Sequence, residues 1–112
     1  MSLPKDQLVI IKSVWPDAQL VEEGGKPFVL LASVRLPDRC TPKIVACLIC
    51  PHERDGYPCR LFLSERVTGG KPVNWNTSTA IAERSWQAFS LKLSNPTPTL
   101  YDIAHHFLGA LA

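Results

Sequence analysis

Hydrophobic and polar positions recur along the chain with two different periods, and both ends of the chain show the period of a helix. Near the start, Leu8, Ile11 and Trp15 lie at helical spacing after an early proline, which predicts a short amphipathic helix that ends before the next proline. Near the end, Thr99 and Asp102 have the spacing of a capping box. The apolar positions that follow them share one helical face and predict a terminal helix: Leu100, Ile103, Ala104, Phe107, Leu108 and Leu111.

The middle of the chain shows features of β-strands. Two β-prone runs flank the stretch from Glu23 to Lys26, where paired glycines permit the positive φ angles of a tight hairpin. The continuous apolar run KIVACLIC, residues 43–50, predicts a buried central strand. The alternating run CRLFLSERV, residues 59–67, predicts a fourth strand. Four consecutive strands with short connections favour an antiparallel meander.

The next two segments are less regular. Residues 68–79, TGGKPVNWNTST, are rich in glycine, proline, asparagine and threonine, which predicts an irregular surface segment that Val73 and Trp75 attach to the body. Residues 80–93, AIAERSWQAFSLKL, fit a helix or a strand. The pattern as a whole predicts an α+β fold: an N-terminal helix, a four-stranded antiparallel meander, a long irregular segment and a C-terminal helix.

Length and composition narrow the class of protein. A chain of 112 residues with 46% hydrophobic content suffices for one core and is short for two ordinary domains, so we expect a single domain over residues 1–112. Twelve basic residues against ten acidic ones give a net charge of +2, and their scatter predicts no nucleic-acid partner. No stretch approaches the roughly 18 consecutive apolar residues of a membrane span, and the N-terminus lacks the features of a signal peptide. We therefore expect a cytoplasmic protein without a membrane partner.

The stretch CLICPHERDGYPC, residues 47–59, holds three cysteines and a histidine, which are residue types that bind zinc. In a strand, however, Cys47 and Cys50 point to opposite faces and cannot share one ion without a break in the strand between them. A dithiol redox pair requires a strand-to-helix turn, whereas this pair lies inside a strand and is followed by Pro51. We therefore expect both thiols to fill the core, and we expect neither a metal nor a cofactor.

Cys40 and Cys59 differ from that pair because each lies in or beside a turn. Cys40 lies between Arg39 and Lys43, and Cys59 precedes Arg60. Neighbouring cations favour the thiolate, which is the nucleophilic form. The alternative for both residues is an unreactive thiol at the surface or partly buried.

The predicted order of elements, together with LPDRCTP, DGYPCRLFLSERV, NWN and ERSWQAFS, resembles the ubiquitin-conjugating-enzyme (UBC) superfamily over nearly the whole chain. The likeness is to its small bacterial members, which occur beside ubiquitin-like proteins, activating enzymes and deconjugating peptidases. The resemblance implies a carrier that accepts a ubiquitin-like protein from an activating enzyme as a cysteine thioester and passes it to an amine. The bacterial operons that encode these proteins together look like anti-phage defences. The resemblance also implies that the turn with Tyr57 and Pro58 helps to bind the activating enzyme.

The sequence departs from the eukaryotic pattern at the catalytic position. That pattern has a His-Pro-Asn triplet after the fourth strand and a cysteine beyond it, and residues 66–80 contain neither. In an antiparallel meander the second and fourth strands end at the same rim, which puts Cys40 beside residues 67–76 and Cys59 on the opposite rim.

We therefore rank Cys40 first and Cys59 second as a relocated nucleophile. Asn74 becomes a candidate donor to the oxyanion of the transfer step, or a residue that only shapes its loop. The alternative function is a catalytically silent UBC-like adaptor that binds the ubiquitin-like protein or the activating enzyme.

Overall fold

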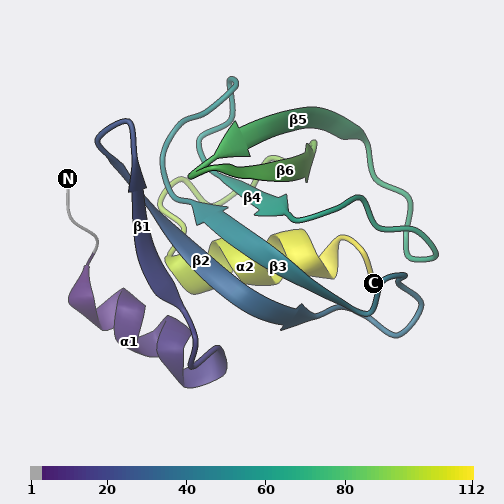
Figure 1. The fold of residues 1–112 in the computed structure, drawn as a ribbon, viewed down its shortest axis with the longest axis horizontal. Coiled ribbons are helices and arrows are strands. Elements are labelled where there is room, and N and C mark those ends of the chain that lie inside the picture. Colours follow the sequence, from purple (N-terminus) through teal and green to yellow (C-terminus); the bar gives the residue numbers. More distant parts are fainter. Residues whose placement is uncertain (1–3) are drawn as a thin grey trace.

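A six-stranded antiparallel sheet with a helix at each end of the chain forms the fold in the computed structural model, which describes residues 4–112 (Figure 1). The strands lie in the order β1-β2-β3-β4-β6-β5. In chain order the elements are α1 (Lys5–Val14), β1 (Gln19–Glu23), β2 (Lys26–Arg35), β3 (Ile44–Cys50), β4 (Arg60–Leu63), β5 (Trp75–Ile81), β6 (Arg84–Phe89) and α2 (Leu100–Gly109).

The helix α1 ends where the sequence predicts. Trp15 has left the helical conformation, with φ −124° and ψ 90°, because a residue that precedes a proline is disfavoured in the α region. Ile11 is buried completely, whereas Val9, Ile10 and Val14 are exposed. The helix therefore contributes one side to the core and leaves apolar side chains in solvent.

The hairpin between β1 and β2 also confirms its prediction. Glu23 pairs with Lys26, and the two glycines between them have positive φ angles of 61° and 75°. Both central residues of a type I′ turn require such angles, and glycine adopts them without steric cost. The turn chemistry of the sequence therefore sets the register of the hairpin.

The central strand β3 is buried on both faces, as its continuous apolar run predicts. Val45, Cys47 and Ile49 lie in the core cluster that also holds the buried residues of α2. The alternate residues of the strand, Ala46, Leu48 and Cys50, belong to a second cluster on the other face. Cys47 and Cys50 are both fully buried, one in each cluster, so the prediction that they fill the core is confirmed.

The prediction of four strands is wrong, because the sheet has six. The predicted irregular segment, residues 68–79, is shorter than expected. It ends at residue 74, and residues 75–81 form β5. The segment that fitted a helix or a strand contains β6, which pairs with β5 as a hairpin and with β4 at Leu63 and Gln87. The turn between them uses positive φ angles at Ala82 and Glu83. Neither residue type is typical of such a turn, which is why the sequence does not indicate it.

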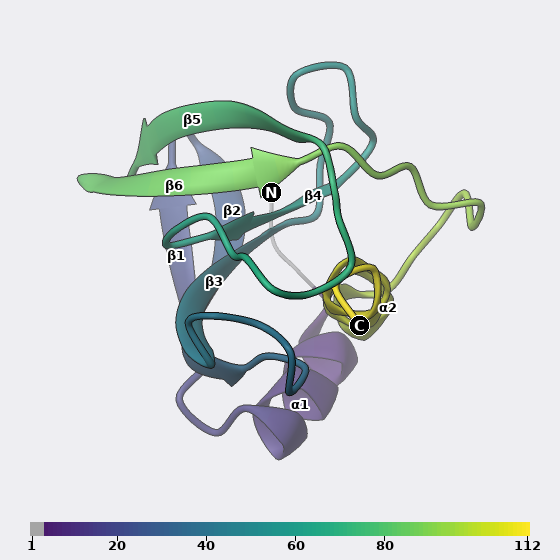
Figure 2. The same ribbon diagram turned by 90° about the vertical axis from the view of Figure 1, so that its right-hand side faces the viewer.

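The hairpin of β5 and β6, which the sequence did not predict, completes the second core cluster. Trp86 is buried in the same cluster as Phe28 and Phe62, and its indole Nε1 donates to the Ile81 carbonyl at 3.1 Å. Figures 1 and 2 both show β5 and β6 on the side of the sheet remote from α1. Val73 and Trp75 pack on the first core cluster, which confirms that they attach the preceding segment to the body.

The C-terminal helix α2 begins with the predicted capping box. The Thr99 hydroxyl accepts a hydrogen bond from the Asp102 backbone N–H at 3.1 Å, and the Asp102 carboxylate accepts one from the Thr99 N–H at 2.9 Å. Ile103, Ala104 and Phe107 face the sheet and are buried. Neither helix of the described residues has the length and apolar character needed to cross a membrane.

We expect Thr99→Ala to lower the free energy of unfolding by about 1 kcal/mol, because it removes one half of the capping box. Urea denaturation followed by circular dichroism measures the change. Thr97→Ala is the matched control, since Thr97 is exposed and its backbone N–H, which the substitution keeps, donates to Asn95. Equal effects of the two substitutions would contradict the role of the cap.

Candidate functional site

Cys40, which the sequence analysis ranks first as a nucleophile, lies beneath the surface of the protein. Its exposed fraction is 1%, and its thiol donates to the Leu111 carbonyl with 3.8 Å between sulfur and oxygen. A Cβ atom added to Gly70 would lie 2.8 Å from the sulfur. Burial raises the pKa of the Cys40 thiol, despite the cations that flank it in the sequence. Two segments distant in sequence therefore cover the sulfur and disfavour its thiolate.

Cys40 lies at the rim of the sheet where β2 and β4 end, as the antiparallel topology predicts. Thr41 and Thr68 form an antiparallel bridge with N···O distances of 2.7 and 2.9 Å, so Cys40 lies beside the segment that follows β4. The Lys71 N–H also donates to the Leu111 carbonyl at 2.9 Å. The first part of the segment, residues 67–71, therefore lies where the sequence places it.

Asn74 does not lie beside Cys40, which corrects the expected pairing of nucleophile and oxyanion donor. β5 runs in the same direction as β4, because both are antiparallel to β6. Asn74 directly precedes β5 and therefore lies at the rim where β4 begins, which is the rim of Cys59. The Asn74 carbonyl accepts a hydrogen bond from the Ser90 N–H at 2.8 Å, just beyond the end of β6. The chain thus crosses from one rim to the other between Gly70 and Trp75.

Cys59 shares the rim of Asn74 but is also buried, with an exposed fraction of 5%. Burial raises the pKa values of all four thiols, and it raises that of Cys47 to about 12. The Cys50 thiol lies 3.6 Å from His52 Nδ1 and donates to the His52 carbonyl at 3.4 Å. Within residues 4–112, no three side chains of His, Cys, Asp or Glu are placed to hold a metal ion.

The rim of Cys59 contains a buried cation, Arg60, whose role the sequence analysis missed. Its side chain is completely buried at the start of β4. The guanidinium donates to the Asp55 carboxylate at 3.1 Å, to the Thr77 hydroxyl at 2.9 Å, to the Asn76 amide oxygen at 2.7 Å and to the Phe89 carbonyl at 3.3 Å. A side chain that donates to four acceptors connects the turn before β4 with β5 and the end of β6. The signal in the sequence is a charged residue at an inward position of an otherwise apolar strand.

Tyr57 lies over this guanidinium. The Arg60 Cζ atom is 4.3 Å from the centroid of the tyrosine ring, and the phenol oxygen is 2.8 Å from the Ser90 hydroxyl. The Asn76 amide nitrogen donates to the same phenol oxygen at 2.9 Å. The hydrogen bond with Ser90, followed by that with Asn76 and the charge of Arg60, lowers the pKa of Tyr57. These contacts hold the turn in one conformation.

The turn therefore presents a preorganised surface. Tyr57 is half-buried, whereas the following Pro58 is exposed. The described part of the chain thus offers a fixed Tyr-Pro turn at one rim and a covered thiol at the other. Such an arrangement suits recognition of a partner, because a surface that is already ordered loses little conformational entropy on binding.

In comparisons with known proteins, the chain matches no family model, no curated protein and no solved structure.

We expect Arg60→Lys to lower the free energy of unfolding by about 2–4 kcal/mol, because a single ammonium group does not reach the acceptors that the planar guanidinium serves. Chemical denaturation measures the loss. Arg66→Lys is the matched control, since the exposed Arg66 also bonds to the added hairpin, through Gln87 at 3.2 Å. This control is expected to change stability by less than about 0.5 kcal/mol. A stability of Arg60→Lys equal to that of the control would contradict the importance of the buried network.

We expect the four thiols of the native protein to react with a maleimide at neutral pH at least about a hundredfold more slowly than in denaturant, because each must wait for local opening. The raised pKa values act in the same direction, since they reduce the thiolate fraction. Time-resolved mass spectrometry with peptide mapping gives the rate at each position. Rapid labelling of Cys40 in the native protein would show that its cover is open in solution.

Proposed function

We propose that the protein is a catalytically silent UBC-like adaptor that binds a ubiquitin-like protein or its activating enzyme without carrying the tag. The observation that supports this proposal is the burial of all four cysteines. A thioester carrier needs a sulfur that a bulky acyl donor reaches, and a raised pKa lowers the supply of the thiolate that attacks. Binding has no such requirement.

The Tyr57–Pro58 turn is the proposed docking surface of the adaptor. The ring of Tyr57 packs on Arg60, and its hydroxyl bonds to Asn76 and Ser90. The resemblance to the UBC superfamily assigns partner binding to a turn of this kind, between the third and fourth strands. The turn lies at that place here, between β3 and β4. A role in anti-phage defence follows from the same resemblance.

The second candidate is a ubiquitin-like-protein conjugating enzyme, as the sequence analysis first ranks it. The position of Cys59 and Asn74 at one rim of the sheet supports this candidate. Cys59 directly precedes β4, and Asn74 directly precedes β5. In this candidate, local opening uncovers the sulfur before it accepts the acyl group from the thioester of the activating enzyme, whose thiolate leaves.

Incubation of the protein with a cognate activating enzyme, ATP and the ubiquitin-like protein tests both candidate functions. The adaptor proposal predicts a complex on size-exclusion chromatography and no reductant-sensitive adduct on gels. We expect Tyr57→Ala to weaken the complex at least about tenfold, because it removes the ring that forms the turn surface. Ile44→Ala is the control, since this exposed apolar residue lies at the start of β3, on the other rim.

An adduct would contradict the adaptor and support the enzyme. Loss of that adduct with Cys59→Ser, but not with Cys40→Ser, would identify Cys59 as the carrier. Loss with Cys40→Ser alone would restore the ranking from the sequence. The absence of both a complex and an adduct would overturn both candidates.

A further inference from the structure

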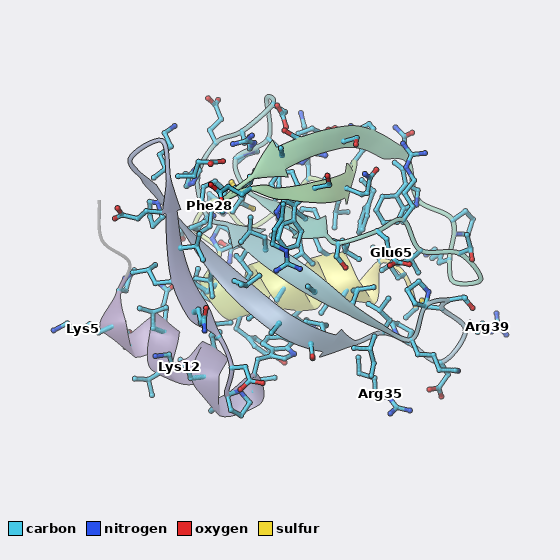
Figure 3. The ribbon with its side chains drawn as sticks, in the orientation of Figure 1. Lys5, Lys12, Phe28, Arg35, Arg39 and Glu65 are labelled. Carbon is cyan, nitrogen blue, oxygen red and sulfur yellow. The ribbon has the colours of Figure 1, made fainter. Side chains whose placement is uncertain are left out.

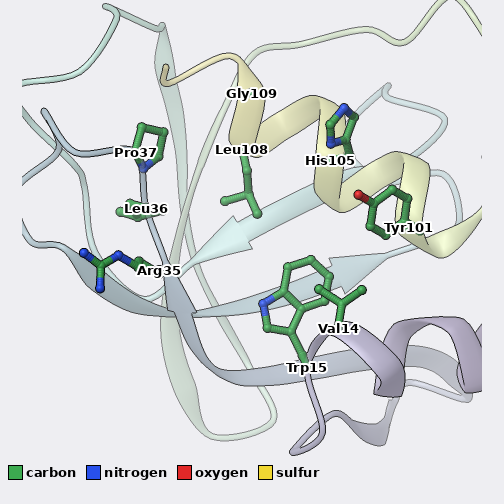
Figure 4. Close-up of a pocket in the computed structure, with 9 residues that line it drawn as sticks. All are labelled: Val14, Trp15, Arg35, Leu36, Pro37, Tyr101, His105, Leu108 and Gly109. Atoms are coloured by element: carbon green, nitrogen blue, oxygen red, sulfur yellow. The ribbon is translucent and has the colours of Figure 1, made fainter.

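An open groove of about 380 Å³ lies between the two helices, on a side of the molecule that the proposed function does not use (Figure 4). The end of α1 supplies Val14 and Trp15, the end of β2 supplies Arg35, and α2 supplies Tyr101 and Leu108. The two helices meet where the Leu100 N–H donates to Gln7 at 3.0 Å. The groove therefore opens beside a fixed contact between the helices.

The walls of the groove are apolar and continue along α1. Val14 is 47% exposed, and Ile10, one helical turn earlier on the same side of α1, is 49% exposed. On the opposite wall the ring of His105 stacks on that of Tyr101, with centroids 5.6 Å apart and planes inclined by 15°. The strip of apolar surface is thus longer than the cavity itself. An occupant that covers both parts needs at least two apolar side chains about one helical turn apart.

The charge of the groove indicates the chemistry of the occupant. Arg35 is the one lining residue of fixed charge, and no carboxylate lines the cavity. Within residues 4–112, an ion pair joins Arg60 to Asp55. Arg35 forms no ion pair with any acidic side chain in this part of the chain. Figure 3 shows Arg35 projecting away from the body of the protein. Figure 4 shows the indole nitrogen of Trp15 turned toward the Arg35 end of the groove. Two donors and no carboxylate favour an anionic group at that end.

We propose that this groove binds an acidic amphipathic helix of a protein partner. Its apolar side chains fill the cavity and cover Ile10, and a Glu or Asp side chain of the same helix accepts hydrogen bonds from Arg35. A helix that places apolar residues three or four positions apart matches the length of the strip, which a single terminal residue or a small molecule does not cover. The guanidinium fork suits a carboxylate because it donates two parallel hydrogen bonds.

The groove and the Tyr57–Pro58 turn lie on opposite sides of the molecule. Figures 1 and 2 both show the connection between β3 and β4 remote from α1. One partner on the turn therefore leaves the groove accessible to another. The inference stands on the geometry and charge of the groove, so it does not depend on the proposed function.

Fluorescence anisotropy with a labelled peptide of about 15 residues tests the proposal, since shorter helices are marginal in water. The probe has Leu at helical positions i, i+3, i+4 and i+7 and Glu at the other positions, and a second probe replaces each Glu by Lys. We expect the acidic probe to bind the full chain and the basic probe to bind at least about tenfold more weakly. We expect Arg35→Glu and Val14→Ser each to weaken the acidic probe at least about tenfold. Arg66→Glu, a charge reversal at an exposed arginine outside the groove, is expected to leave binding unchanged.

Other results would overturn the proposal. Equal binding of the two probes, or binding that Arg35→Glu leaves intact, would exclude recognition of an acidic helix. A dimer detected by sedimentation equilibrium and dissociated by Arg35→Glu would identify a second copy of the chain as the occupant. Binding of octanoate in an Arg35-dependent manner, without binding of the acidic probe, would indicate a small carboxylate instead. Circular dichroism of each variant shows whether it is folded, and Arg35→Gln provides a milder replacement if Arg35→Glu is not.

Discussion

The burial of one guanidinium constrains the arrangement of the sheet. A charge removed from water is costly unless hydrogen bonds and opposite charge surround it, and Arg60 is completely buried. Its acceptors come from the turn before β4, from β5 and from the end of β6. The strands β5 and β6 are therefore part of the environment that Arg60 requires. Because Asp55 remains partly exposed, the hydrogen bonds to neutral groups carry much of this compensation.

The same network gives the Tyr57–Pro58 rim its fixed surface. The tyrosine ring covers the guanidinium, and its hydroxyl joins Ser90 to Asn76. Stability and recognition are coupled there, since loss of Arg60 would release the turn as well as the hairpin. The groove between the helices has a different origin. It exists because α1 and α2 meet at Gln7 and Leu100 and leave Val14 and Leu108 on facing walls.

The cysteines show how far local pattern predicts chemistry. Alternation along β3 determines that Cys47 and Cys50 face opposite sides of a strand that is buried on both, and the sequence contains that alternation. The environment of Cys40 depends on Gly70 and Leu111, which are distant in the sequence. Neighbouring cations suggest a reactive thiol, but desolvation raises its pKa instead. Short-range charge and long-range packing thus oppose each other, and packing determines the result.

The sequence by itself determined the local structure: α1 and its end at Trp15, the glycine hairpin, the central strand and the capping box of α2. Each depends on residues a few positions apart, whose geometry the backbone fixes. Tertiary structure alone decided the rest. The strands β5 and β6 are polar on one side, and their turn lacks glycine. They join the sheet because β6 pairs with β4 and β5 pairs with β6, and both strands contribute to the core cluster that contains Phe28 and Phe62. The separation of Asn74 from Cys40 and the burial of Arg60 follow from that pairing, because hydrogen bonds and burial between distant segments have no signature in the order of neighbouring residues.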